Sequence, residues 1–235
     1  MIRPWPLLLL GACLSAHAMQ AGLPEARRPA FEECTKGVTL STATTRIRYL
    51  PAPTEDGGRG WKVEVRTGDV VRTDTESYAC FRDPDGQLWD FLPKFKDETR
   101  RYVVLEGLLT TSSGSNPAPL EVQATLVPKD RHSSIKVLEN LVTRSSRHVV
   151  GIDPFGLLTI LDLETGKESK VRLNPRPAPA RTPSLSIRKA TLGKHTLDLR
   201  YEILDAQDEP VPVHCRIDLR TGKRTRLKAP GPLPP

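Results

Sequence analysis

Strict alternation of apolar and polar residues is the feature that most limits how this chain can fold. Residues 61–66 read Trp-Lys-Val-Glu-Val-Arg, and the same alternation recurs in residues 120–126 and 197–203. Successive side chains of a β-strand point to opposite faces, so this period of two predicts strands with one buried face. Residues 102–109 and 157–163 are more continuously apolar, which predicts central strands of a sheet.

Turn motifs between these runs predict how the strands are connected. Gly68, Gly166 and Gly222 each follow a threonine and separate two strand-like runs, and glycine readily adopts the positive φ that a short hairpin with a bulge needs. Residues 83–88 and 153–158 share the pattern D-P-x-G-x-L, in which proline presets the second position of a tight turn and glycine closes it. Together these patterns predict an all-β fold built from antiparallel hairpins, arranged as a sandwich, a barrel or a meander.

A small, degenerate β-propeller is the second architecture to consider. Residues 162–167 and 218–223 share D-L-x-T-G-K, and with the D-P-x-G-x-L turns they resemble the outer hairpins of propeller blades. Blades recur at about 40 to 50 residues, whereas the shared glycines are 70 residues apart for Gly86 and Gly156 and 56 residues apart for Gly166 and Gly222. The spacing therefore favours the sandwich, barrel or meander.

Residues 1–18 have the pattern of a secretory signal, because one basic residue precedes a short apolar run that ends in small residues. Residues 16–18, Ala-His-Ala, form an A-x-A cleavage site. Residues 10–13, Leu-Gly-Ala-Cys, instead resemble the lipobox of bacterial lipoproteins, whose cysteine is acylated. The protein is therefore expected in the periplasm, or as a membrane-anchored lipoprotein of the cell envelope with Cys13 acylated after removal of residues 1–12.

The rest of the chain is expected to have three parts. Residues 19–33 are rich in Ala, Arg, Pro and Glu without any period, which predicts a flexible tether. Residues 34–228 are expected to form a single β-rich domain, since all-β units often stay undivided at about this length. The four prolines of residues 174–183 mark the one candidate boundary inside it, and the proline-rich residues 229–235 are expected to be a disordered tail.

Three cysteines remain in the folded part after either cleavage: Cys34, Cys80 and Cys215. In an oxidising compartment this number predicts one disulfide and one further thiol. Cys215 alternates in phase with Val213 and Ile217, so it is expected to face the core as a small hydrophobic residue. We therefore predict a disulfide between Cys34 and Cys80, which would restrict the unfolded chain.

The net charge of +7 is concentrated near the C-terminus. Residues 19–170 hold 21 basic and 22 acidic residues, whereas residues 171–235 hold 13 and 6. A predicted hairpin at the C-terminal end is the candidate binding site. Its basic residues are Arg216, Arg220, Lys223, Arg224, Arg226 and Lys228. Such a surface attracts acidic partners, although basic residues on an edge strand also prevent unwanted strand pairing.

The sequence contains no recognisable catalytic or metal-binding pattern. It lacks a G-x-S-x-G elbow, and the neighbours His214 and Cys215 would point to opposite faces of one strand. Asp83, Asp85 and Asp90 lack the full spacing and the closing glutamate of a calcium loop, and no His/Cys spacing fits zinc. We therefore expect no enzymatic activity, no metal and no cofactor.

These patterns predict an exported binding protein of the cell envelope. The most concrete expectation is a periplasmic inhibitor or immunity protein that neutralises a secreted antibacterial toxin or hydrolase, by analogy from its address and architecture. The expected partner is an acidic secreted protein. No nucleic acid is expected, because aromatic residues make up only 5% of the chain and no groove-reading helix is evident. Membrane contact is expected only through a lipid anchor. A structural envelope lipoprotein, or a hydrolase of cell-wall or glycan substrates, remains as an alternative.

Overall fold

Five antiparallel sheets follow one another along the chain in the computed structural model, which describes residues 31–54, 58–109, 121–153, 155–173, 185–204 and 209–227. Within each sheet the strands are hydrogen-bonded in the order in which they occur in the sequence, so each sheet is a meander. None of these sheets closes on itself into a barrel. The prediction of an all-β, antiparallel fold is confirmed, and of its variants the meander describes the individual sheets.

The elements are strands of three to nine residues and one short helix. Helix α1 (Phe31–Cys34) precedes the first sheet, which contains β1 (Thr45–Pro53), β2 (Arg59–Thr67) and β3 (Val70–Thr73). A separate hairpin contains β4 (Cys80–Arg82) and β5 (Leu88–Asp90). The second sheet contains β6 (Lys94–Glu98), β7 (Tyr102–Leu109), β8 (Glu121–Pro128) and β9 (Lys136–Leu138). The third sheet contains β10 (Leu141–Arg144), β11 (His148–Ile152), β12 (Leu157–Asp162) and β13 (Glu168–Arg172). The fourth sheet contains β14 (Ser186–Leu192), β15 (Thr196–Leu204), β16 (Pro210–Asp218) and β17 (Arg224–Arg226).

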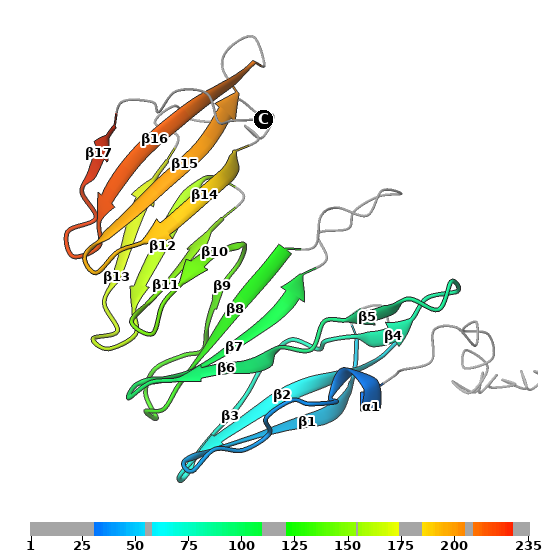
Figure 1. The fold of residues 1–235 in the computed structure, drawn as a ribbon. Helices are drawn as coiled ribbons and strands as arrows, with labels where there is room; N and C mark the ends of the chain where they lie inside the picture. Colours follow the sequence, from blue (N-terminus) through cyan, green and yellow to red (C-terminus); the bar gives the residue numbers. More distant parts are fainter. Residues whose placement is uncertain are drawn as a thin grey trace, which may run out of the picture.

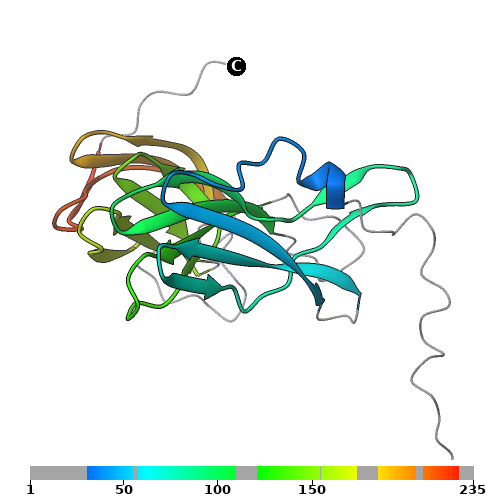
Figure 2. The same cartoon turned by 90° about the horizontal axis from the view of Figure 1, so that it is seen from below.

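The four larger sheets are stacked face to face in chain order, with the first and fourth sheets at the two ends of the stack (Figure 1). A separate apolar core fills each space between neighbours. Ile47 and Val63 meet Val103 between the first two sheets, and Leu158 meets Leu199 between the last two. The middle core contains residues of the second and third sheets, among them Leu126 and Leu161. Figure 2 shows the first sheet in front of the others when the stack is viewed from below.

A structural repeat underlies this stack. The first strands of the four sheets begin at residues 45, 94, 141 and 186, which are 49, 47 and 45 residues apart. Three of these sheets have four strands and the first has three; consecutive four-stranded meanders at this spacing are typical of propeller blades. The glycine spacing obscured the repeat because Gly86 lies in the separate β4–β5 hairpin, whereas Gly156 lies within the third sheet, between β11 and β12.

The outer hairpins of the last three sheets share one hydrogen-bonding device. In each hairpin, one aspartate Oδ1 accepts hydrogen bonds from the backbone N–H groups of the residues two and three positions later in the sequence. The aspartates are Asp130, Asp162 and Asp218. Gly166 and Gly222 complete the last two turns with φ values of 76° and 72°. The predicted hairpins at these glycines are confirmed, as is the hairpin at Gly68, whose φ is 56°.

Strand β8 differs from the prediction for residues 120–126. Gln123 and Thr125 alternate with apolar residues but are only 3% and 1% exposed. They lie in the second sheet, which has a neighbouring sheet on each face. Gln123 Nε2 donates a hydrogen bond to Thr125 Oγ1 (3.3 Å). Buried polar groups in folded proteins are generally hydrogen-bonded in this way. Alternation on its own therefore overestimated how much of this strand is in water.

The predicted disulfide joins Cys34 of α1 to Cys80 of β4, with 6.5 Å between their Cα atoms. Both cysteines are buried in the core of the first sheet. Cys215 is a free, buried thiol in the core between the third and fourth sheets. Both cysteine predictions are confirmed, and burial raises the pKa of the Cys215 thiol above its usual value, which keeps it protonated.

The described fold begins at Phe31, inside the segment expected to be a tether. The ring of Phe31 stacks on Trp61, with 4.9 Å between ring centroids, so α1 packs on the first sheet. Residues 1–30, Cys13 among them, and residues 174–183 and 229–235 lie outside the described residues. The third and fourth sheets, on either side of residues 174–183, share one core.

Substitution of Gly222 tests the conformation of the outer hairpin. Gly222→Ala is expected to lower the free energy of unfolding by about 1 kcal/mol, because a Cβ is strained at positive φ. The added methyl group would not clash with its surroundings, since the nearest atom to the new Cβ would be Val171 Cγ2 at 3.6 Å. Urea unfolding measures the change. Gly222→Asn is the matched control and is expected to lose less, because asparagine tolerates this conformation; equal losses would point to a packing defect instead.

Candidate binding site at the outer edge of the last two sheets

The predicted basic residues lie on the last hairpin of the fourth sheet. Arg220 and Lys223 are exposed in the turn between β16 and β17, and Arg226 is exposed at the end of β17. Because β17 is hydrogen-bonded only to β16 within its sheet, it is an edge strand. Lys228 lies outside the described residues.

Hydrogen bonds hold the turn in a defined conformation. Asp218 Oδ1 accepts the backbone N–H groups of Arg220 (3.0 Å) and Thr221 (2.7 Å), and also the Thr221 hydroxyl (2.8 Å). Hydrogen bonding to Thr221 is the largest cause of the lowered pKa of Asp218, so this carboxylate stays charged and keeps capping the turn. Leu219, which precedes Arg220 in the turn, is buried. The hairpin therefore presents its basic side chains from a rigid support.

Arg224 and Arg216 have structural partners instead. Arg224 Nη1 donates hydrogen bonds to the carbonyl oxygens of Arg172 (3.0 Å) and Leu173 (2.6 Å), which fastens β17 to the third sheet. Arg216 lies on the face of β16 opposite to the buried Cys215 and Ile217. It forms a bidentate ion pair with Asp198, with N–O distances of 2.7 and 2.9 Å. The structure therefore separates these two arginines from Arg220, Lys223 and Arg226.

The neighbouring sheet contributes a cation that the sequence did not indicate. Arg172 is exposed at the end of the edge strand β13, where its own carbonyl accepts the Arg224 hydrogen bond. Lys167, in the outer hairpin of the third sheet, donates to the carbonyl oxygen of Arg220 (3.3 Å). The two outer edges therefore lie side by side. We name Arg172, Arg220, Lys223 and Arg226 the basic edge.

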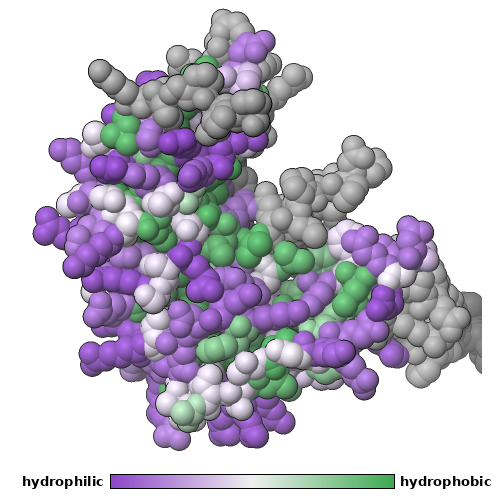
Figure 3. All heavy atoms as spheres, viewed as in Figure 1, coloured by the Kyte–Doolittle hydropathy of each residue, from purple (hydrophilic) through white to green (hydrophobic). Residues whose placement is uncertain are grey.

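Negative charge neutralises the basic edge only in part: the Asp218 carboxylate lies in the same turn and attracts Arg220. None of its four residues makes an ion pair within the described part of the chain. The nearest acidic group on β13, Glu168, is already paired with Lys136 (2.8 Å) and Lys170 (3.3 Å). Figure 3 shows mainly hydrophilic residues on the side of the molecule where β13 and β17 lie. The edge is thus a positively charged, water-facing surface.

One sequence signal could have linked the two hairpins. The shared D-L-x-T-G-K motif occupies equivalent turns of the third and fourth sheets, and equivalent turns of stacked repeats lie next to each other. Residues on β13 would then have been grouped with those on β17. The irregular spacing of the glycines hid this relationship.

The other side chains considered for chemistry stay apart. Cys215 is buried, whereas His214 lies on the opposite face of β16. No cluster of three or more His, Cys, Asp or Glu side chains suited to a metal ion occurs among the described residues.

Comparison with known proteins gives no relative of this chain. No family model matches its sequence, and no curated protein or solved structure matches it. Within the described residues, no helix has the length and apolar character needed to cross a membrane.

Proposed function

We propose that this protein is an exported, non-enzymatic binding protein of the cell envelope that recognises an acidic partner protein through its basic edge. Its most concrete role is that of a periplasmic inhibitor or immunity protein, which neutralises a secreted antibacterial toxin or hydrolase. The observation that carries the proposal is the basic edge itself. Four exposed cations without ion pairs among the described residues project from the edge strands β13 and β17 and from the turn before β17, which side-chain hydrogen bonds hold together.

Electrostatics explains why such an edge suits a protein partner. Charges of one sign on one surface speed the encounter with a surface of opposite sign and exclude partners of like charge. The support is rigid because Asp218 fixes the turn and Arg224 fastens it to β13, so little conformational freedom is lost on binding. The proposed export rests on the leader pattern of residues 1–18 and is compatible with the Cys34–Cys80 disulfide.

Protection of the sheet edge is a competing explanation for the same charges. Charged residues on an edge strand block pairing with other chains, and acidic residues serve this purpose as well as basic ones. Binding to an acidic partner, in contrast, requires positive charge. Charge reversal therefore separates the two roles.

The variant Arg220→Glu/Lys223→Glu/Arg226→Glu tests the proposal. It is expected to remain folded and to keep the oligomeric state of the unaltered protein, but to associate with the partner captured from envelope extracts at least roughly tenfold more slowly. Surface plasmon resonance at several salt concentrations measures the association rate, which for the unaltered protein should fall as salt rises.

A matched control reverses three exposed cations on other elements, in the variant Arg131→Glu/Lys189→Glu/Lys194→Glu. This control carries the same change in net charge and is expected to bind nearly as fast as the unaltered protein. If both variants lose binding equally, overall charge and not the basic edge attracts the partner. If neither does, the edge has no role in recognition.

A further inference from the structure

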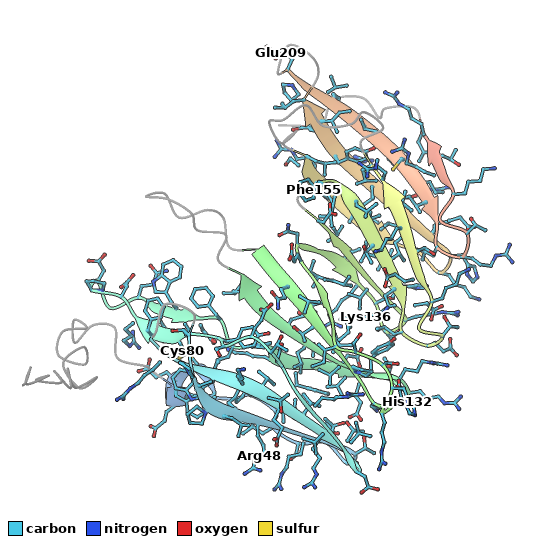
Figure 4. The ribbon with its side chains drawn as sticks, turned by 180° about the vertical axis from the view of Figure 1, so that it is seen from behind. Arg48, Cys80, His132, Lys136, Phe155 and Glu209 are labelled. Carbon is cyan, nitrogen blue, oxygen red and sulfur yellow. A yellow bond between two sulfur atoms is a disulfide. The ribbon has the colours of Figure 1, made fainter. Side chains whose placement is uncertain are left out.

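A second positively charged surface covers the outer face of the first sheet. On β1 and β2, Ile47, Val63 and Val65 are buried on the side that faces the second sheet. The alternate residues therefore point away from the stack. They are Arg46, Arg48, Lys62, Glu64 and Arg66, and Figure 4 shows Arg48 on the side of the sheet away from the rest of the molecule. We name Arg46, Arg48, Lys62 and Arg66 the arginine face.

The arrangement of charges on this face is expected to destabilise the first sheet. Arg46 and Arg66 are direct partners across β1 and β2, and like charges at such positions destabilise a sheet. One carboxylate, Glu64, lies among the four cations, where it pairs with Arg48 at 3.9 Å. Arg46, Lys62 and Arg66 have no ion pair within the described residues. A cost to the fold with no local compensation points to a role in binding.

The outer face of the fourth sheet, at the opposite end of the stack, has more of its positive charge neutralised. Arg216 pairs with Asp198 (2.7 Å) and Arg188 pairs with Glu202 (2.7 Å). Lys189 and Arg200 are direct partners across β14 and β15 and have no ion pair among the described residues. The first sheet therefore has more unpaired cations than the fourth, three compared with two.

The composition of the arginine face favours a lipid surface over a nucleic acid. Single-stranded nucleic acid stacks on aromatic platforms. The aromatic residues of these strands point the other way, since Tyr49 donates a hydrogen bond to the Pro93 carbonyl (3.0 Å) and Trp61 packs in the core. What remains outside is an array of four cations and Glu64, beside the exposed Val71 of β3.

We infer that the arginine face docks the protein on an anionic membrane surface through the phosphates of the lipid headgroups. Guanidinium groups bind phosphate oxygens in pairs, and mobile headgroups can adapt to the spacing of cations along a strand. Each basic residue held at such a surface contributes about a fivefold gain in binding. In this orientation the fourth sheet lies at the far end of the stack, so the basic edge stays free for a soluble partner.

Vesicle co-sedimentation of the full chain tests the inference. The probes are vesicles of phosphatidylcholine alone and vesicles that also contain phosphatidylglycerol. The protein is expected to bind the anionic vesicles more strongly, with binding that falls as salt rises. Neutral vesicles report any contribution from the apolar N-terminal segment or from an acyl chain. The variant Arg46→Gln/Lys62→Gln/Arg66→Gln is expected to lose roughly a hundredfold of the anionic component of binding.

The matched control Arg220→Gln/Lys223→Gln/Arg226→Gln removes the same net charge from the basic edge and is expected to keep most of the vesicle binding. Equal losses in the two variants would overturn the inference, because they would show a general attraction of charge. Unchanged binding of the arginine-face variant, or equal binding of the unaltered chain to both vesicles, would also overturn it. Thermal unfolding guards against misfolding: relief of the Arg46–Arg66 repulsion should leave the melting temperature unchanged or raised.

Discussion

Replacing both Cys34 and Cys80 by alanine is expected to lower the free energy of unfolding by about 4 kcal/mol. The disulfide joins residues 46 positions apart, and a closed loop of this length removes that amount of conformational freedom from the unfolded chain in the entropic account. The bond also ties α1, and with it Phe31, to the core of the first sheet. Urea unfolding of the two proteins under oxidising conditions measures the difference.

The free thiol supplies the control for this prediction. Cys215 is as buried as the disulfide cysteines, at 1% exposure, so Cys215→Ala removes a buried sulfur without opening a cross-link. It is expected to cost far less than the double variant. Reduction of the disulfide in the unaltered protein should lower stability as much as the double substitution does. If neither change moves the midpoint of urea unfolding, the cross-link does not contribute to stability.

Loss of the Glu98 carboxylate is expected to have the second-largest effect. Glu98 of β6 accepts hydrogen bonds from Lys129 Nζ (2.6 Å), Thr42 Oγ1 (2.6 Å) and Thr45 Oγ1 (2.8 Å), and from the Thr44 hydroxyl. Thr45 is the first residue of β1, and Thr42 and Thr44 lie just before it, whereas Glu98 ends β6 and Lys129 directly follows β8 of the second sheet. One carboxylate, 15% exposed, therefore connects two sheets.

These contacts also determine the pH dependence of stability. Burial opposes ionisation of Glu98, but hydrogen bonds from Lys129 and the threonines outweigh it and lower the pKa from 4.5 to about 2. A carboxylate with a lowered pKa in the folded state stabilises the protein above its unfolded pKa. This stabilisation is complete above about pH 4.5 and is lost as the pH falls toward about 2.

Glu98→Gln is expected to lower the free energy of unfolding by roughly 2 to 3 kcal/mol at neutral pH. The difference from the unaltered protein should shrink as the pH falls toward the folded pKa, because both side chains are then neutral. Urea unfolding over a series of pH values measures this convergence. Glu202→Gln is the control; its ion pair with the exposed Arg188 is screened by water and should contribute little. A pH-independent loss at Glu98 would show that its charge is not the stabilising feature.

Local patterns in the sequence were sufficient for several of the strands and for the hairpins at Gly68, Gly166 and Gly222. Trp61, Val63 and Val65 are buried in β2, and Leu197 and Leu199 are buried in β15, as alternation predicted. The disulfide followed from the same reasoning, because only Cys215 lay in phase with a strand core. Side-chain direction and turn conformation depend on a few neighbouring residues, and so they can be inferred without the rest of the fold.

The candidate site could be predicted only in part. Arg220, Lys223 and Arg226 were found from their charge and position, but Arg224 looked the same and proved to hold β17 against β13. Arg172 was missed because its place beside the hairpin depends on how the third and fourth sheets stack. That stacking is decided by contacts between residues far apart in the chain, whose sequence patterns do not name their partners.

Two strands show where the sequence alone stops being informative. Period two predicted that Lys62, Glu64 and Arg66 share one face of β2, and that Gln123 and Thr125 share one face of β8. Only the tertiary structure decided that the first face is open and the second is buried. The physical reason is that alternation reports which side chains lie together on a sheet, whereas burial depends on whether another sheet packs over them. The first sheet ends the stack and the second lies inside it, so the same local pattern gives a charged surface in one place and a hydrogen-bonded interior in the other.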